Sequence, residues 1–268
     1  MHVAELYVYP VKSLRGIALD EAAIGCRGIE FDRRWMVVDP EGVFMTQRTT
    51  PAMATIRTSL TATELILTDA GGRSVSVPLD FKGDPTCVRV WKSQCSANYV
   101  NPEADALLSD ALGTECRLVG MPDSSRRQSA SDLARDGDLV GFADGCPILI
   151  VSKASLDDLN HRIAEPIPIN RFRPNVVVDG AGSFDEDGWR RIEIDQVHMR
   201  YLKRCGRCIM TTQDHETGER RGEEPLRTLT AYRLYEKNVL FGAYFAADTF
   251  GVIRRGDRLL VKEKTPSN

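Results

Sequence analysis

The segment TELILTDAGGRSVSVPLDFKGDPTCVRVW (residues 63–91) contains three strand-like runs, TELILT, SVSVPL and CVRVW. The runs alternate polar and apolar residues or are rich in β-branched residues, and the intervening DAGG and KGDP are typical turn sequences. Similar runs occur earlier, in AELYVYPV, EAAIGC and RWMVVD. Many short strands at such close spacing predict an antiparallel barrel or sandwich for residues 1–90.

Two helices are predicted in the middle of the chain. The first covers residues 102–112, where Asn101 can cap the helix and Pro102 suits its first turn. Its predicted apolar face consists of Ala106, Leu107, Ala111 and Leu112. The second helix covers KASLDDLNHRIA (residues 153–164) and follows a capping Ser152.

The remaining segments predict one irregular region and more strands. Residues 123–138 are polar, charged and Ser-rich, so we expect a mobile loop or a domain junction there. Strands are predicted again in CPILIVS, FRPNVVV, WRRIEID, VHMRYLK, CIMTT, VLFGAYFAA and DRLLVKE. The fold class is therefore predicted to be mainly β (α+β).

The composition is that of an ordinary globular protein. The 268 residues carry a formal net charge of −3 and are 42% hydrophobic. This charge provides no basic field for nucleic acid, and no apolar run reaches the roughly 20 residues of a membrane span. We therefore expect no nucleic acid and no membrane as partner. Met1 leads directly into HVAELYVYPV, which predicts a cytoplasmic protein whose seven cysteines stay reduced.

Cys205 and Cys208 form a C-x-x-C motif in RCGRCIMTT (residues 204–212). A zinc site would need a second ligand pair, and a thioredoxin-like pair would begin a helix, whereas IMTT favours a strand. Buried structural thiols are the commonest alternative. Four nearby basic residues favour a thiolate, so a functional thiol and a structural thiol are equally open on these residues alone.

Three motifs place cations at the ends of predicted strands: YPVKSLRG, FDRRWMVV and NRFRPNVVV. Arginine binds phosphate through two parallel hydrogen bonds, and lysine acts as a mobile point charge. The three motifs could therefore meet at one anion. Each could equally be a solvated charge at a strand end, because neighbouring residues of a strand point to opposite faces.

Taken in order, YPVKS, DRRWMVV, CPILIVSKASLDDLN, NRFRPNVVV, CGRCIMTTQDHETG and a late GD resemble one protein family. The set is similar to MOSC-domain molybdenum enzymes, in the branch of the mitochondrial amidoxime reducing component and the bacterial YcbX-type reductases. The resemblance implies an N-terminal MOSC β-barrel region (residues 1–120). A mixed, mostly antiparallel β-barrel MOSC domain (residues 121–268) would follow and carry the metal-ligand cysteine.

The resemblance also implies a cofactor and its ligands. Members of the family bind the molybdenum cofactor, a pterin dithiolene with one phosphate. Cys208 would be the metal ligand and a catalytic residue, and Asp214 a second catalytic residue near the metal. The implied cofactor-binding residues are Lys12, Ser13, Arg33, Arg173, Asn175, Gly145, Cys146, Gly206 and Arg207. The resemblance thus assigns cofactor binding to Arg33 and not Arg34, and to Arg173 and not Arg171. Gly206 stands where some relatives have serine.

The implied activity is reduction of N-hydroxylated compounds, such as amidoximes, hydroxylamines and N-hydroxylated bases, to amines or amidines plus water. The substrate would be a small N-hydroxylated molecule. No ferredoxin-type cysteine spacing is present, so electrons would come from a separate donor protein. The alternatives are a MOSC-class carrier of the cofactor or of sulfur without turnover, and a β-rich binding module with structural thiols.

Overall fold

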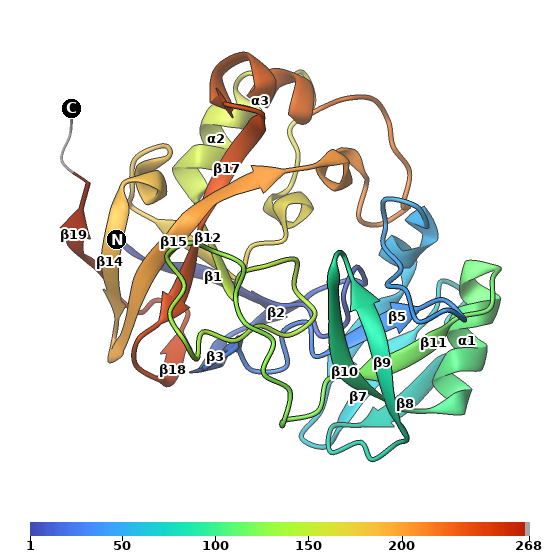
Figure 1. Ribbon diagram of the computed structural model, residues 1–268. Helices are drawn as coiled ribbons and strands as arrows, with labels where there is room; N and C mark the ends of the chain where they lie inside the picture. Colours follow the sequence, from blue (N-terminus) through green and yellow to red (C-terminus); the bar gives the residue numbers. More distant parts are fainter. Residues whose placement is uncertain (266–268) are drawn as a thin grey trace.

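The computed structural model describes residues 1–265, which consist mainly of strands arranged in four sheets (Figure 1). The largest sheet has the order β19-β14-β15-β17-β12-β13-β1-β2, with β16 beside β17. Its neighbours are antiparallel except for the parallel pair β12 and β13. Its strands are β1 (His2–Val8), β2 (Ile17–Leu19), β12 (Ile148–Ser152), β13 (Val176–Asp179), β14 (Trp189–Ile194), β15 (Val197–Arg207), β16 (Leu234–Tyr235), β17 (Asn238–Ala247) and β19 (Leu259–Lys264).

Three smaller sheets complete the fold, in the orders β5-β11-β10-β9, β18-β3-β4 and β6-β7-β8. In Figure 1 the strands β7 to β11 lie with α1 to one side of the large sheet. The strands are β3 (Glu21–Gly25), β4 (Gly28–Ile29), β5 (Trp35–Val38), β6 (Arg57–Leu60), β7 (Glu64–Thr68), β8 (Ser74–Pro78), β9 (Pro85–Val90), β10 (Ser93–Tyr99), β11 (Arg117–Gly120) and β18 (Gly251–Arg254). The prediction of a mainly β, mostly antiparallel fold is confirmed.

The first predicted helix is confirmed as α1 (Pro102–Leu112). The side chain of Asn101 accepts hydrogen bonds from the backbone N–H groups at positions 103 and 104. Of its predicted apolar face, Leu107 is buried and Ala111 and Leu112 pack against the core, whereas Ala106 is exposed. The apolar stripe begins two residues earlier than predicted, so the buried residues are Ala104, Leu107 and Leu108.

The second predicted helix, α2 (Lys153–Asn160), begins where expected but is shorter. The Asn160 amide donates to the Ile167 carbonyl and accepts from the Ile167 N–H, which turns the chain back on itself. Helix α3 (Leu226–Arg233) was not predicted, since its threonines are poor helix formers. Short 3₁₀ helices lie at η1 (Pro51–Thr55), η2 (Ile169–Phe172), η3 (Asp185–Asp187) and η4 (Ile209–Thr212). Among residues 1–265, no helix is long and apolar enough to cross a membrane.

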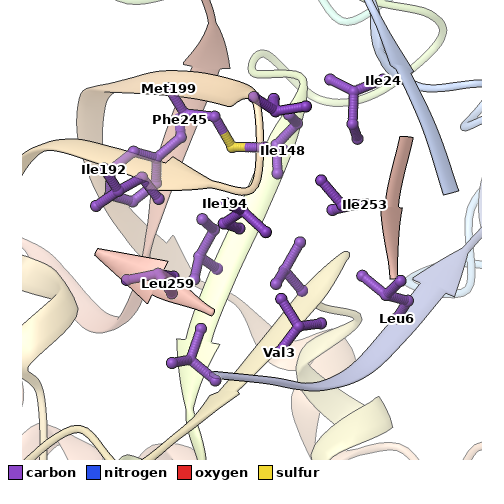
Figure 2. Close-up of a cluster of buried hydrophobic side chains, with 14 of the residues drawn as sticks. Val3, Leu6, Ile24, Ile148, Ile192, Ile194, Met199, Phe245, Ile253 and Leu259 are labelled. Carbon is purple, nitrogen blue, oxygen red and sulfur yellow. The ribbon is translucent and has the colours of Figure 1, made fainter. Parts of the chain in front are cut away.

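The main hydrophobic core lies between the large sheet and the sheet of β18, β3 and β4 (Figure 2). Leu6, Met199 and Phe245 come from the large sheet, and Ile24 and Ile253 come from the smaller one. Each of these side chains is at most 4% exposed. Burying a side chain of this size contributes about 2 kcal/mol. The first strand of the chain is thus fixed against strands from the C-terminal half.

The segment after β1 joins the large sheet to the sheet of β5. Lys12 N–H donates to the Trp35 carbonyl over 2.8 Å, and Trp35 N–H donates to the Pro10 carbonyl over 3.0 Å. Arg33 N–H donates to the Tyr9 carbonyl over 2.8 Å. These bonds bring together the two cationic motifs of Lys12 and Arg33, which are 21 positions apart in the chain.

Residues 123–138 are irregular but are held by polar contacts, which corrects the expectation of a mobile loop. Asp138 forms a buried ion pair of 2.5 Å with Arg200. Ser131 Oγ donates to the Leu202 carbonyl, and Arg127 donates to the carbonyls of Gly141 and Ala143. The segment is ordered by hydrogen bonds between side chains and backbone, which its low apolar content did not reveal.

Candidate functional site

A cavity of about 150 Å³, here called the first cavity, lies where the loops after β1, before β5 and before β13 meet the end of β15. Nine of the residues predicted for the site line it: Lys12, Ser13, Arg33, Cys146, Arg173, Asn175, Gly206, Arg207 and Cys208. The wall also includes Arg48, Asp144, Arg171, Met210 and Tyr244. The fold therefore brings the three cationic motifs and the C-x-x-C motif together.

The wall of the first cavity is strongly cationic. Its basic residues are Lys12, Arg33, Arg48, Arg171, Arg173 and Arg207. Asp144 is the one acidic residue among the described residues of the wall. Arg173 Nη2 and Arg207 Nε are buried without a hydrogen-bond partner in the described chain. Buried donors are nearly always paired, so these two atoms are donors that an anion in the cavity could use.

Lys12 and Asp144 form an ion pair inside this wall. Lys12 Nζ also donates to the Phe142 carbonyl over 2.9 Å, and Lys12 is 5% exposed. Burial lowers the pKa of Lys12 to about 8, although Asp144 acts in the opposite direction. Burial raises the pKa of Asp144, but Lys12 and Arg48 outweigh this effect, so its pKa lies well below the usual value.

Arg33 and Arg173 both lie close to the Tyr9 ring. Their guanidinium carbons are 4.3 Å and 4.2 Å from its centre, as in cation–π pairs. Arg33 is held by both carboxylate oxygens of the buried Asp32, at 2.7 and 2.5 Å. Burial, followed by the charge of Arg33, lowers the pKa of Arg173 to about 10. Two positive charges of the cavity wall are therefore held at the same aromatic ring.

Three residues of the wall have left-handed backbone: Ser13 (φ 65°), Arg33 (φ 48°) and Arg173 (φ 52°). Residues other than glycine rarely adopt this conformation, which costs about 1–2 kcal/mol each. Such strain concentrates at functional sites. Its presence at three residues of one cavity supports a functional role for this wall.

The two cysteines of the C-x-x-C motif have different surroundings. Cys208 is half-buried, and Arg48 Nη2 donates to its Sγ over 3.4 Å. Cys205 is 2% exposed and accepts from Arg207 Nη1 over 2.8 Å. All seven cysteines are free thiols. Among residues 1–265, no three His, Cys, Asp or Glu side chains are grouped as a metal site.

The predicted strand CIMTT is wrong. β15 ends at Arg207, and residues 209–212 form the 3₁₀ helix η4. The hydroxyls of Thr211 and Thr212 donate to the carbonyls of Cys208 and Ile209, which closes the turn. These hydroxyls favour the turn over the strand that β-branched side chains otherwise prefer.

Gly145 and Asp214, the other two predicted site residues, do not line the first cavity. The Gly145 carbonyl accepts from Ala130 N–H and Ser129 Oγ, so it anchors the polar segment. The Asp214 carboxylate accepts from the backbone at positions 216 and 217 and lies 3.6 Å from Arg171. This carboxylate is used in a turn, and the predicted catalytic role of Asp214 stays a prediction.

Arg48, Asp144 and Tyr244 were missed as site residues. Arg48 lies in TQRTT and Asp144 in FADGCP, and neither sequence carries a recognisable chemical motif. Trp91 donates from Nε1 to Asp144 over 3.1 Å, and the Arg48 guanidinium lies 4.8 Å from the Trp91 ring. Only the tertiary fold brings these residues to Cys208.

The fold and this site are those of a MOSC-domain protein. Two family models match the chain, a MOSC N-terminal beta barrel domain over residues 1–115 and a MOSC domain over residues 138–260. The predicted division at residues 120 and 121 stays a prediction.

Curated relatives match nearly the whole chain. Mouse mitochondrial amidoxime-reducing component 1 is 34% identical, over 95% of this chain and 80% of the relative. The human component 1 is 34% identical, over 95% of this chain and 81% of the relative. The bovine component 2 is 33% identical, over the same shares of the two chains. The chain therefore belongs to the family of the MOSC-domain amidoxime-reducing components.

This assignment confirms the resemblance stated from the sequence, and with it the prediction of an enzyme of that class. It overturns the predicted cytoplasmic location, because these relatives are named as mitochondrial components. The prediction rested on residues 1–11, and a strand at that position carries no information about the compartment.

Proposed function

We propose that this chain reduces N-hydroxylated compounds with a bound molybdenum cofactor, and that Cys208 is the protein ligand of the metal. The observation that carries the proposal is the position of Cys208 in the wall of a cavity that holds six cationic residues. The names of the relatives, which refer to amidoxime reduction, support the same reaction.

The residues of the first cavity suit this cofactor. A pterin dithiolene with one phosphate presents a dianion and a molybdenum ion. The unpartnered donors of Arg173 and Arg207, with buried Lys12 and half-buried Arg33, suit the phosphate and the pterin. The half-buried thiol of Cys208 suits the metal, because a thiolate is the form in which cysteine binds metals.

The residues around Cys208 orient its sulfur. Arg48 donates to Sγ, and a thiolate accepts such a charge-assisted bond more strongly than a thiol does. Asp144 accepts from Arg48 at 3.1 Å and also pairs with Lys12, so it fixes both cations in the wall. Arg48 is therefore assigned as a positioning residue for Cys208.

The overall reaction takes two electrons and two protons, breaks the N–O bond, and releases the amine or amidine with one water. The cofactor supplies the two-electron redox chemistry when bound. The chain supplies the thiolate, the clamp for the phosphate and the shape of the entrance. We further propose that a separate protein donates the electrons.

The test is an anaerobic assay of the purified holoprotein with reduced viologen and benzamidoxime, together with a molybdenum analysis. The proposal expects equimolar molybdenum and steady formation of benzamidine. Bound cofactor without turnover would refute the reductase and favour the carrier. Absence of both after expression in a host that makes the cofactor would refute the entire proposal.

A further inference from the structure

A second cavity, of about 320 Å³, adjoins the first, and Arg171, Arg173 and Met210 line both. Its wall is formed by the loop after β1, the strand β6, the helix η2 and the residues after η4. Apart from Arg173, which lines both cavities, none of the residues given a role above lines this cavity. Its size is sufficient for a small organic molecule.

The second cavity is rich in positive charge. Four arginines line it, Arg15, Arg57, Arg171 and Arg173, and none of the described residues in its wall is acidic. Within residues 1–265, the guanidinium groups of Arg57 and Arg173 form no ion pair. Arg171 lies 3.6 Å from Asp214, and Arg15 lies 3.7 Å from the exposed Glu216. Two of the four positive charges of the wall therefore have no carboxylate partner among the described residues.

Several buried polar atoms of this wall have no hydrogen-bond partner in the described chain. They include Tyr9 Oη and Gln213 Oε1, on side chains that are 2% and 1% exposed, and also Arg171 Nε and His215 Nδ1. Three of the four can donate. A buried polar group without a partner lowers the free energy of unfolding by about 1–3 kcal/mol. These groups therefore destabilise the fold when the cavity holds no ligand.

Aromatic rings complete the wall. The rings of Tyr7 and Tyr9 both line the cavity, with centres 6.4 Å apart. Burial, followed by the charge of Arg15, lowers the pKa of His215, so its ring is neutral near pH 7 and adds a flat polar surface. The wall thus offers planar groups beside its arginines.

We infer that the second cavity is a binding site for a small organic anion, either a phosphate ester or a carboxylate with a planar body. Arg15, Arg57, Arg171 and Arg173 would bind the anionic group, and Tyr7 and Tyr9 would contact the planar part. The inference goes beyond the proposed reductase and is independent of it, because anion binding can be measured without turnover.

The test is calorimetric titration of the purified full chain with phenyl phosphate and with benzoate at low ionic strength. Arg15 and Arg57 line only the second cavity, and Arg48 lines only the first. We expect Arg15→Gln together with Arg57→Gln to weaken binding by roughly tenfold, because two charge-assisted contacts are lost. Arg48→Gln serves as the probe of the first cavity. Arg258→Gln, at an exposed arginine that lines neither cavity, is the matched control.

Tighter binding of phenyl phosphate assigns the site to phosphate esters, and tighter binding of benzoate assigns it to carboxylates. The inference is overturned if neither probe binds, or if neutral benzyl alcohol binds equally well. It is also overturned if Arg48→Gln removes the binding while the double variant leaves it intact. Circular dichroism of the variants shows that they are folded, so a loss of binding reports on the cavity.

Discussion

Arg48 Nη2 lies 3.4 Å from Cys208 Sγ, and this contact joins two residues that are 160 positions apart in the chain. The same nitrogen lies 3.1 Å from Asp144 Oδ2, which holds the guanidinium in place. The contact distinguishes Cys208 from Cys205, whose sulfur is buried and accepts from Arg207. The two cysteines of the C-x-x-C motif therefore differ because different residues surround them.

Replacing Arg48 by Ala should lower the reactivity of Cys208. Loss of Arg48 removes a hydrogen bond and a positive charge from Cys208 Sγ, so alkylation of Cys208 by iodoacetamide in cofactor-free protein should slow by about tenfold, the equivalent of 1.4 kcal/mol. Peptide mass spectrometry follows the modification at this cysteine. Arg48→Lys should restore part of the rate. Equal rates in Arg48→Ala and the wild type would show that the contact does not affect the sulfur.

Anion binding in the first cavity should weaken as the pH rises through about 8. The pKa of Lys12 is lowered to about 8 by burial, so its charge is present below this pH and is lost above it. Sulfate does not titrate in this range, and its affinity should fall between pH 7 and 9.5 in a calorimetric titration. Lys12→Arg keeps a fixed charge and should remove the decline. The same decline in both proteins would exclude Lys12 as its cause.

Gly206→Ser should be tolerated. A Cβ at Gly206 would lie 3.2 Å from Oδ1 of Asn238, the end of an exposed side chain that can rotate away. We expect the free energy of unfolding to change by less than about 0.5 kcal/mol. Gly242→Ala is the contrasting variant: Gly242 has φ +79°, and its Cβ would lie 2.7 Å from Val151. Gly242→Ala should lower the free energy of unfolding by more than about 2 kcal/mol. Equal changes in the free energy of unfolding for the two variants, measured by urea denaturation, would contradict this prediction.

Asp138→Ala should loosen the polar segment 123–138. Its carboxylate pairs with buried Arg200, and removing one partner of a buried ion pair costs about 3–5 kcal/mol. Asp248 also lies 2.8 Å from Arg200, so we expect the lower end of that range. Limited proteolysis should cleave within the segment faster than in the wild type. Asp132→Ala, an exposed position in the same segment, is the control. Equal cleavage in the two variants would refute the role of the ion pair.

The sequence predicts repeating features well and tertiary contacts poorly. The alternation in TELILT and SVSVPL predicts β7 and β8, and Asn101 with Pro102 predicts the start of α1. The 3₁₀ turn after Cys208 was missed because threonine hydroxyls, and not propensity, determine it. Residues 123–138 were judged by their apolar content, yet polar contacts hold them.

In the site, too, residues in sequence motifs could be predicted and residues placed by tertiary contacts could not. The family motifs predict Lys12, Arg33, Arg173 and Cys208, which line one cavity in the structure. Arg48 contacts Cys208 from a segment without any motif, and such a contact depends on how distant loops pack. The turn that the Asp214 carboxylate closes likewise could not be predicted from the sequence, because it depends on hydrogen bonds to the backbone at positions 216 and 217.

The most direct test of the central claim compares Cys208→Ser with Cys87→Ser, a substitution at an exposed cysteine of β9. Both holoproteins are assayed with reduced viologen and benzamidoxime, and their pterin and molybdenum contents are measured. We expect Cys208→Ser to retain much of its pterin but to lose its reductase activity, while Cys87→Ser keeps the wild-type rate. Wild-type turnover by Cys208→Ser would contradict the assignment of Cys208 as the metal ligand.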